Sequence, residues 1–138
     1  RLLLWLQRRG DPIENARATV SGQLVVDESA IPEVFYKLMA ARQGSPAHER
    51  SLRSLLTAEG SYGRMHPVFD IREEILDIEC PTALVWGDED AFWPPEVGRP
   101  VADEMADAAF HDLPNHGHMP WLEPGDEAET RVRSFLDA

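Results

Sequence analysis

The sequence has little of what disulfide-bonded, nucleic-acid-binding or membrane-spanning proteins need. Cys80 is the only cysteine in 138 residues, so no disulfide can form within the chain, and a reducing, cytoplasmic compartment is expected. Lysine occurs once, and 13 basic residues face 25 acidic ones, which gives a formal charge of −12. Such a surface repels the phosphates of nucleic acids and of anionic lipids, so neither is an expected partner.

Long hydrophobic runs are also missing. The apolar start Leu2–Leu6 is five residues long and ends at Gln7, whereas a membrane-spanning helix needs about 20 apolar residues. Hydrophobic residues nevertheless make up 43% of the sequence, which is enough for one modest domain with a core. Because the first residue is Arg1 and not Met, we expect the sequence to be part of something longer.

Residues 1–65 show helical periodicity and no alternating strand pattern. A first helix is expected within residues 2–9, and a second begins at Asp11, an N-cap residue followed by proline. Apolar residues at spacings of three and four predict a third helix over 29–43; they are Ile31, Val34, Phe35, Leu38 and Met39. Ser45 caps a fourth helix, and residues 60–63 are expected to form a loop.

From about residue 66 the pattern changes to alternating strands and helices. The apolar run Thr82–Trp86 predicts a strand buried on both faces, and residues 109–114 predict a second strand. A helix is expected over 95–107, with Val97, Val101 and Met105 on one face. A final helix is expected over 124–136, with Ala128, Val132, Phe135 and Leu136 facing inward. This order predicts an α/β fold with a right-handed parallel crossover, joined to the helical half near residues 60–67.

Two loops that follow the predicted strands carry residues suited to proton transfer. Asp90 lies four residues past Trp86, and His118 lies four residues past Pro114. Neighbouring parallel strands are about 4.8 Å apart and end at the same edge of the sheet, so these loops can touch. A carboxylate on one imidazole nitrogen fixes the tautomer and stabilises the imidazolium that forms when the other nitrogen takes a proton.

The residues around these loops resemble a known family. Cys80–Asp90, Trp93-Pro94 and Gly117–Glu123 are similar to the C-terminal part of the α/β-hydrolase superfamily. In that family a Gly-x-x-Asp turn after the penultimate strand carries the acid of a catalytic triad, and a Gly-His-x-Pro turn after the last strand carries the base. The resemblance therefore implies that Asp90 is the triad acid and His118 the triad base.

The resemblance also implies the architecture. Residues 66–138 correspond to the C-terminal part of the α/β-hydrolase core, a β-α-β-α parallel unit, and residues 1–65 resemble the helical lid (cap) segment of the family. The fold class is then α/β, as the C-terminal portion of an α/β-hydrolase fold.

The nucleophile elbow of the family, Gly-x-Ser-x-Gly, does not occur in this sequence. Ser21 lacks the leading glycine, and Ser61 has neither the spacing nor a preceding strand. We therefore expect a fragment of a serine hydrolase that cleaves an ester or a carbon–carbon bond by acyl transfer. It supplies the acid and the base but no nucleophile, so it is expected to be inactive alone, and no cofactor is implied.

Apolar side chains flank both turns, namely Phe92, Trp93, Met119 and Trp121. They either line a pocket for a small ester-like or apolar acyl substrate or pack around the rim of the sheet. His116 is the alternative base, but a surface role in the turn is expected because His118 holds the family position. Asp88 and Glu89 are expected to form a solvated acidic turn.

A metal site is the remaining chemical alternative. It would use His111, His116, His118 and Glu123, but no helical His-x-x-x-His spacing supports it, so no metal is expected. Glu123 is instead expected to be a charge at a helix N-terminus, and Cys80 a buried residue at the start of a strand.

A non-enzymatic function is also open. The Thr82–Trp86 strand would leave an unpaired edge, through which the chain could bind a partner, associate with itself or pair with a missing N-terminal half.

Overall fold

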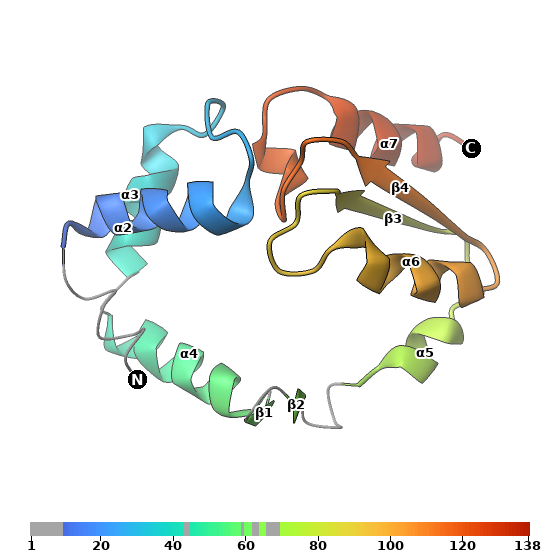
Figure 1. Ribbon diagram of the computed structural model, residues 1–138, viewed down its shortest axis with the longest axis horizontal. Coiled ribbons are helices and arrows are strands. Elements are labelled where there is room, and N and C mark those ends of the chain that lie inside the picture. Colours follow the sequence, from blue (N-terminus) through green and yellow to red (C-terminus); the bar gives the residue numbers. More distant parts are fainter. Residues whose placement is uncertain (1–9, 43–44, 59, 62–63, 66–69) are drawn as a thin grey trace. The chain divides into compact units, whose positions relative to one another are not determined.

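The computed structural model describes residues 10–42, 45–58, 60–61, 64–65 and 70–138 (Figure 1). They form two compact units. The first contains the described residues up to Arg17 together with Pro32–Arg72, and the second contains Ala18–Ile31 together with Glu73–Ala138. The helix expected within residues 2–9 and part of the expected linker lie outside the described residues.

The first unit is helical. Helix α2 spans Pro12–Thr19, and the Asp11 carboxylate accepts hydrogen bonds from the N–H groups of Ile13 and Glu14 at 2.7 and 3.3 Å, which confirms the predicted N-cap. Helix α4 spans Pro46–Ala58. Its N-cap prediction is also confirmed, because the Ser45 hydroxyl accepts from the N–H of His48 at 3.1 Å.

Helix α3 spans Glu33–Arg42, a later start than the sequence pattern suggested. Pro32 disfavours the helical conformation at the residue before it, so the helix begins after the proline. Of the apolar residues that predicted this helix, Ile31 is buried just before its start and Phe35 and Met39 are half-buried, whereas Val34 and Leu38 are exposed. Tyr36, which the apolar pattern does not include, is 1% exposed. The guanidinium of Arg17 lies 4.2 Å above the centre of the Tyr36 ring. This cation–π contact stabilises the buried position of the Tyr36 ring.

The expected loop at residues 60–63 is wrong at its first two residues. Strand β1 (Gly60–Ser61) pairs antiparallel with β2 (Arg64–Met65) in a minimal ladder.

The second unit carries the predicted parallel strands. Strand β3 (Thr82–Gly87) pairs with β4 (Ala108–Leu113), in a register that runs from Thr82 opposite Ala108 to Gly87 opposite Leu113. Helix α6 (Pro95–Glu104) connects them, and α7 (Glu127–Leu136) follows β4. In Figure 1 the strands lie between α6 and α7, and a short helix, α5 (Arg72–Leu76), precedes β3. The predicted α/β class and strand order are confirmed.

Strand β3 is less buried than its apolar sequence suggested. Residues 82–86 are half-buried, because within the described part of the chain β3 pairs with one strand, β4. Cys80, expected to be buried at the strand entrance, is exposed.

Helix α6 buries small residues beside part of the predicted apolar face: Met105, which directly follows the helix, is 8% exposed. In α6 the buried residues are Pro95, Gly98 and Ala102, whereas Val97 is exposed. Glycine at position 98 lets the helix approach the Trp86 ring, since a Cβ there would lie 2.7 Å from it. Small residues thus form the contact because the Trp86 ring already fills the space between helix and strand.

Helix α7 is mostly solvated. Val132 and Leu136, both expected to face inward, are exposed, and Ala128 and Phe135 are half-buried.

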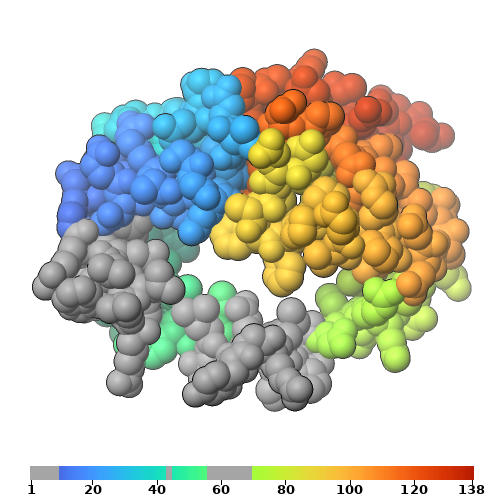
Figure 2. Space-filling view, viewed as in Figure 1, coloured from blue at the N-terminus to red at the C-terminus, as the bar shows by residue number. Residues whose placement is uncertain are grey.

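Residues 18–31 belong to the second unit although their sequence lies in the helical half. Helix α2 passes into a π-helical turn, η1 (Val20–Leu24), in which the N–H of Val25 donates to the carbonyl of Val20 at 3.1 Å. Val20 and Val25 are 0% and 5% exposed. In the space-filling view this segment lies directly against the loop after β3 (Figure 2).

Candidate active site

Asp90 and His118 meet at the edge of the sheet where β3 and β4 end. Because Gly87 is paired with Leu113, the loops that follow the two strands start side by side. Asp90 Oδ2 accepts a hydrogen bond from His118 Nδ1 at 2.8 Å. The carboxylate side chain is 6% exposed and the imidazole 38% exposed. A buried acid therefore holds a histidine that solvent can still reach.

The Asp90 carboxylate is fixed by its own loop as well. Its other oxygen, Oδ1, accepts from the N–H groups of Phe92 and Trp93 at 2.8 and 3.0 Å. Burial opposes ionisation, but the hydrogen bond from His118 and those from the Trp93 and Phe92 backbone outweigh it, so the pKa of Asp90 lies below its ordinary value of 3.8. Asp90 is thus an ionised acceptor at neutral pH.

This lowered pKa predicts an acid limit to stability. A carboxylate whose pKa is lower in the folded than in the unfolded state stabilises the fold above the unfolded pKa, and this contribution is lost as the pH falls through the folded pKa. We expect the stability difference between the chain and Asp90→Asn to be constant near neutrality and to shrink below about pH 4. Urea unfolding at a series of pH values measures it, with Asp103→Asn as a surface-charge control. A difference that stays constant down to pH 2 would contradict the prediction.

The hydrogen bond also sets the tautomer of His118. Since a carboxylate can only accept, Nδ1 carries the proton and Nε2 carries the lone pair. The Phe92 ring lies 4.8 Å from the imidazole, measured between ring centres, at an interplanar angle of 57°. The arrangement leaves Nε2 as the basic nitrogen, the form that a general base requires.

Three further hydrogen bonds join the two loops. The N–H of Asp88 donates to Leu113 O at 3.1 Å, that of Glu89 to His116 O at 2.9 Å, and that of Asn115 to the Asp88 carboxylate at 2.7 Å. Asp88 is exposed in the turn, as expected, and its carboxylate also has this structural role. The loops are therefore one connected structure rather than two independent turns.

Gly87 allows the loops to come this close. A Cβ built at this residue would lie 2.2 Å from Gly117 O and 2.3 Å from His116 O, far inside van der Waals contact. The predicted end of the β3 strand is thus also the point where the two turns touch.

His116, the alternative base, does not lie on the surface as expected. It is 8% exposed, and its Nδ1 donates to Pro114 O at 2.8 Å. This hydrogen bond within its own turn gives it a structural role.

The four apolar residues expected near the turns are placed differently from one another. Phe92, Trp93 and Trp121 are 47%, 50% and 66% exposed, whereas Met119 is half-buried. Trp86 Nε1 donates to Trp93 O at 2.7 Å, which fixes the backbone beside Asp90. The three exposed rings are therefore not part of the core that the described residues form.

Glu123 has a position that the sequence interpretation missed. It lies before α7 and outside its first turn, so it is not the expected helix charge. The residue is 7% exposed, and its carboxylate accepts hydrogen bonds from the backbone of Gly117 and of residues 26–27. The proximity of Glu123 to His118 in sequence was visible, but its partners on residues 26–27 were not.

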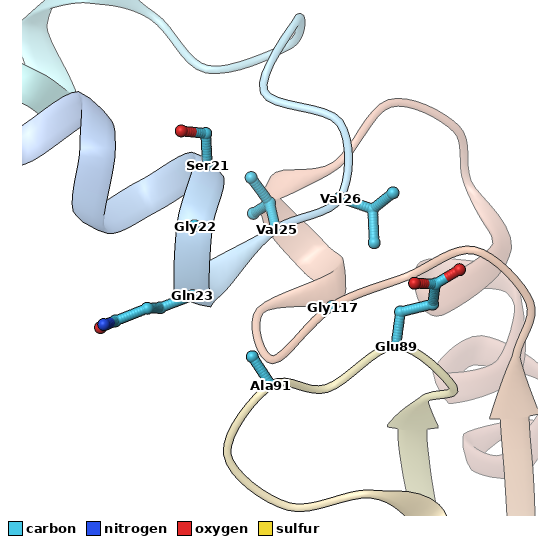
Figure 3. Close-up of a pocket in the computed structure, with 8 residues that line it drawn as sticks. All are labelled: Ser21, Gly22, Gln23, Val25, Val26, Glu89, Ala91 and Gly117. Atoms are coloured by element: carbon cyan, nitrogen blue, oxygen red, sulfur yellow. The ribbon is translucent and has the colours of Figure 1, made fainter.

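A cavity of about 280 Å³ lies between residues 21–26 and the two loops. Its lining residues are Ser21, Gly22, Gln23, Val25, Val26, Glu89, Ala91 and Gly117. In Figure 3 the Ser21 hydroxyl points away from Ala91 and Gly117, so it is not directed at the Asp90–His118 loops.

Among the described residues, no three His, Cys, Asp or Glu side chains gather as ligands for one metal ion.

No helix in the described ranges has the length and apolar character needed to cross a bilayer.

Comparison with known proteins identifies the fold. No family model matches the sequence. The chain is 26% identical over 121 residues to a pimeloyl-[acyl-carrier protein] methyl ester esterase of Chromobacterium violaceum, an alignment that covers 80% of this chain and 48% of that protein. The chain thus spans about half the length of this curated relative.

Solved structures agree. A serine hydrolase involved in carbazole degradation matches with a TM-score of 0.76 and 18% identity, over 94% of this chain and 49% of that one. A thermophilic esterase from Thermogutta terrifontis matches with a TM-score of 0.63 and 25% identity, over 99% and 48%. The predicted resemblance is confirmed: the chain has the C-terminal portion of an α/β-hydrolase fold.

Proposed function

Because the chain has the C-terminal portion of an α/β-hydrolase fold, we propose that it belongs to a serine hydrolase in which Asp90 is the triad acid and His118 the triad base. The observation that carries the proposal is the 2.8 Å hydrogen bond between the buried carboxylate and the accessible imidazole. Both groups lie on loops after adjacent parallel strands, where α/β proteins place working residues.

The proposed reaction is acyl transfer to water. A serine supplied by a part of the protein outside this sequence attacks the substrate carbonyl, and His118 Nε2 takes the hydroxyl proton. The imidazolium, stabilised by Asp90, then returns that proton to the leaving group as the acyl-enzyme forms. Water, deprotonated by Nε2 in its turn, releases the acid and regenerates the serine.

The proposed substrate is a small molecule with an ester-like carbonyl or a carbon–carbon bond next to one. Two similar proteins are described as a methyl ester esterase and a thermophilic esterase, which favours esters. Phe92, Trp93, Met119 and Trp121 would contact an apolar acyl group, because they lie on or next to the Asp90–His118 loops and the three aromatic rings among them are exposed. Residues 1–65 would be the helical lid (cap) segment of that hydrolase.

Without a nucleophilic serine, the chain is expected not to hydrolyse esters. The purified 138-residue chain should release no p-nitrophenol from p-nitrophenyl acetate above the buffer rate, and a fluorophosphonate probe should not label it. The protein extended upstream to a Gly-x-Ser-x-Gly segment should do both. Hydrolysis by the 138-residue chain that disappears in His118→Ala would contradict the expectation.

An interaction role is the second candidate, and the half-buried β3 edge favours it. Residues 82–86 are apolar, and β3 pairs with one strand in the described residues. We expect the chain to associate through this edge, with a second copy or with an N-terminal half of the fold. Light scattering at high protein concentration measures the association. A folded species that stays strictly monomeric would exclude it.

A further inference from the structure

Glu123 is a buried carboxylate held by backbone groups. Its Oε1 accepts from the N–H of Gly117 at 2.5 Å, and its Oε2 accepts from the N–H groups of Val26 and Asp27, each at 3.0 Å. Within the described part of the chain, no basic side chain forms an ion pair with it. Three backbone donors therefore provide the compensation that a buried carboxylate needs.

These bonds place His118 between two anchored residues. On one side, Gly117 is tied to Glu123. On the other side, the N–H of Met119 donates to Leu24 O at 2.8 Å. Both anchors lead to the same segment, residues 24–27, one directly and the other through Glu123.

Residues 24–27 pack closely against the turn 117–119. It begins where the π-helical turn η1 ends, and Val25 is extended, with φ −138° and ψ 156°, and 5% exposed. A Cβ at Gly117 would lie 2.9 Å from both Leu24 O and Val25 Cα. The turn and the segment are therefore in close contact, so the backbone at 117–119 has little room to shift.

From this geometry we infer that Glu123 is a positioning residue: by fastening the turn 117–119 to residues 24–27, it holds the His118 imidazole in hydrogen-bond geometry with Asp90. The inference rests on the proposed function only for its consequence in catalysis. Within the described residues, the hydrogen bonds of the Glu123 carboxylate go to backbone N–H groups, so it acts through the backbone of the turn. Loss of its bonds lets the His118 side chain leave the Asp90 carboxylate.

The test is an NMR measurement on the His118 ring proton in the full ¹⁵N-labelled chain. A proton on Nδ1 that is hydrogen-bonded to a carboxylate resonates far downfield, and Asp90→Asn identifies the signal by removing its charged acceptor. In Glu123→Gln the side-chain NH₂ replaces one acceptor oxygen, so at least one of the three N–H groups loses its partner. We expect the His118 signal to be lost or to move upfield, and the Gly117 amide signal to move with it.

The control is Glu129→Gln, which makes the same change at an exposed residue paired with Arg133 and should leave both signals in place. A folded Glu123→Gln chain with an unchanged His118 signal would overturn the inference. If this variant does not fold, the inference is tested by heating the unmodified chain while its Gly117 amide protection and its His118 ring-proton signal are followed. Concerted loss of Gly117 amide protection and of the His118 signal supports the inference, and loss of protection with an intact His118 signal overturns it.

Activity gives an independent measurement in the nucleophile-containing protein. A misplaced base should lower kcat by about 100-fold with little change in KM. The proposed function fails separately, if His118→Ala leaves ester hydrolysis unchanged, and the NMR result does not depend on that outcome.

Discussion

Replacement of His118 by alanine in the nucleophile-containing protein should lower kcat for ester hydrolysis by about 10⁴-fold or more. The variant removes the nitrogen that we propose takes the serine proton, and no other described imidazole is hydrogen-bonded to Asp90. Asp90→Asn should have a comparable effect, because an amide that donates to Nδ1 stabilises the wrong tautomer. Steady-state kinetics with a p-nitrophenyl ester measure both.

His116→Ala is the matched control, because it removes a histidine two residues away in the same turn. Its hydrogen bond goes to Pro114 O, so the variant should lose stability and keep kcat within about tenfold, since the proposed mechanism gives His116 no part in proton transfer. An equal loss of kcat in both variants, measured below their unfolding temperatures, would assign the effect to the turn and not to His118 as the base.

The second large effect concerns stability at Gly87. Gly87→Ala should lower the free energy of unfolding by about 3 kcal/mol or more, the upper range for overpacking a close contact. The added methyl group would overlap backbone oxygens of Gly117 and His116, and backbone cannot move aside as a flexible side chain can. Separation of the loops would also strain the hydrogen bond from Glu89 to His116. Urea unfolding followed by tryptophan fluorescence measures the loss.

Gly22→Ala is the control for glycine replacement in the same unit. Apart from its chain neighbours and the backbone of its own helical turn, no described atom lies within 4 Å of a Cβ at this position, which is in the helical turn η1. The variant should be as stable as the parent or up to about 1 kcal/mol more stable, because alanine restricts the unfolded chain. If Gly87→Ala is no less stable than Gly22→Ala, the close loop contact does not constrain the fold.

Local sequence signals predicted the framework well. Asp11 and Ser45 were recognisable N-caps because capping depends on neighbouring N–H groups. The run Thr82–Trp86 was recognisable as a strand from its length and apolar content. The positions of Asp90 and His118 just after strands indicated that their loops would lie at one edge of the sheet.

The orientation of side chains was less predictable. Tyr36 and not Val34 is the buried residue of α3, and Gly98 and not Val97 faces the sheet in α6. In both helices a large aromatic ring determines which residue faces inward. In α3 the Tyr36 ring contacts Arg17, and in α6 the Trp86 ring fills the space beside Gly98. Apolar periodicity counts hydrophobic residues, but packing also selects on shape and on the partner across the contact.

The sequence by itself determined the order of strands and helices, the acidic surface and the two residues whose loops meet. Only the tertiary structure decided what holds that meeting in place, namely the contact at Gly87 and the bonds from Glu123 to residues 26–27. The physical reason is the separation along the sequence over which each interaction acts. Caps and periodicity act within a few residues, whereas the Glu123 hydrogen bonds join groups 96 and 97 positions apart, which no local pattern encodes.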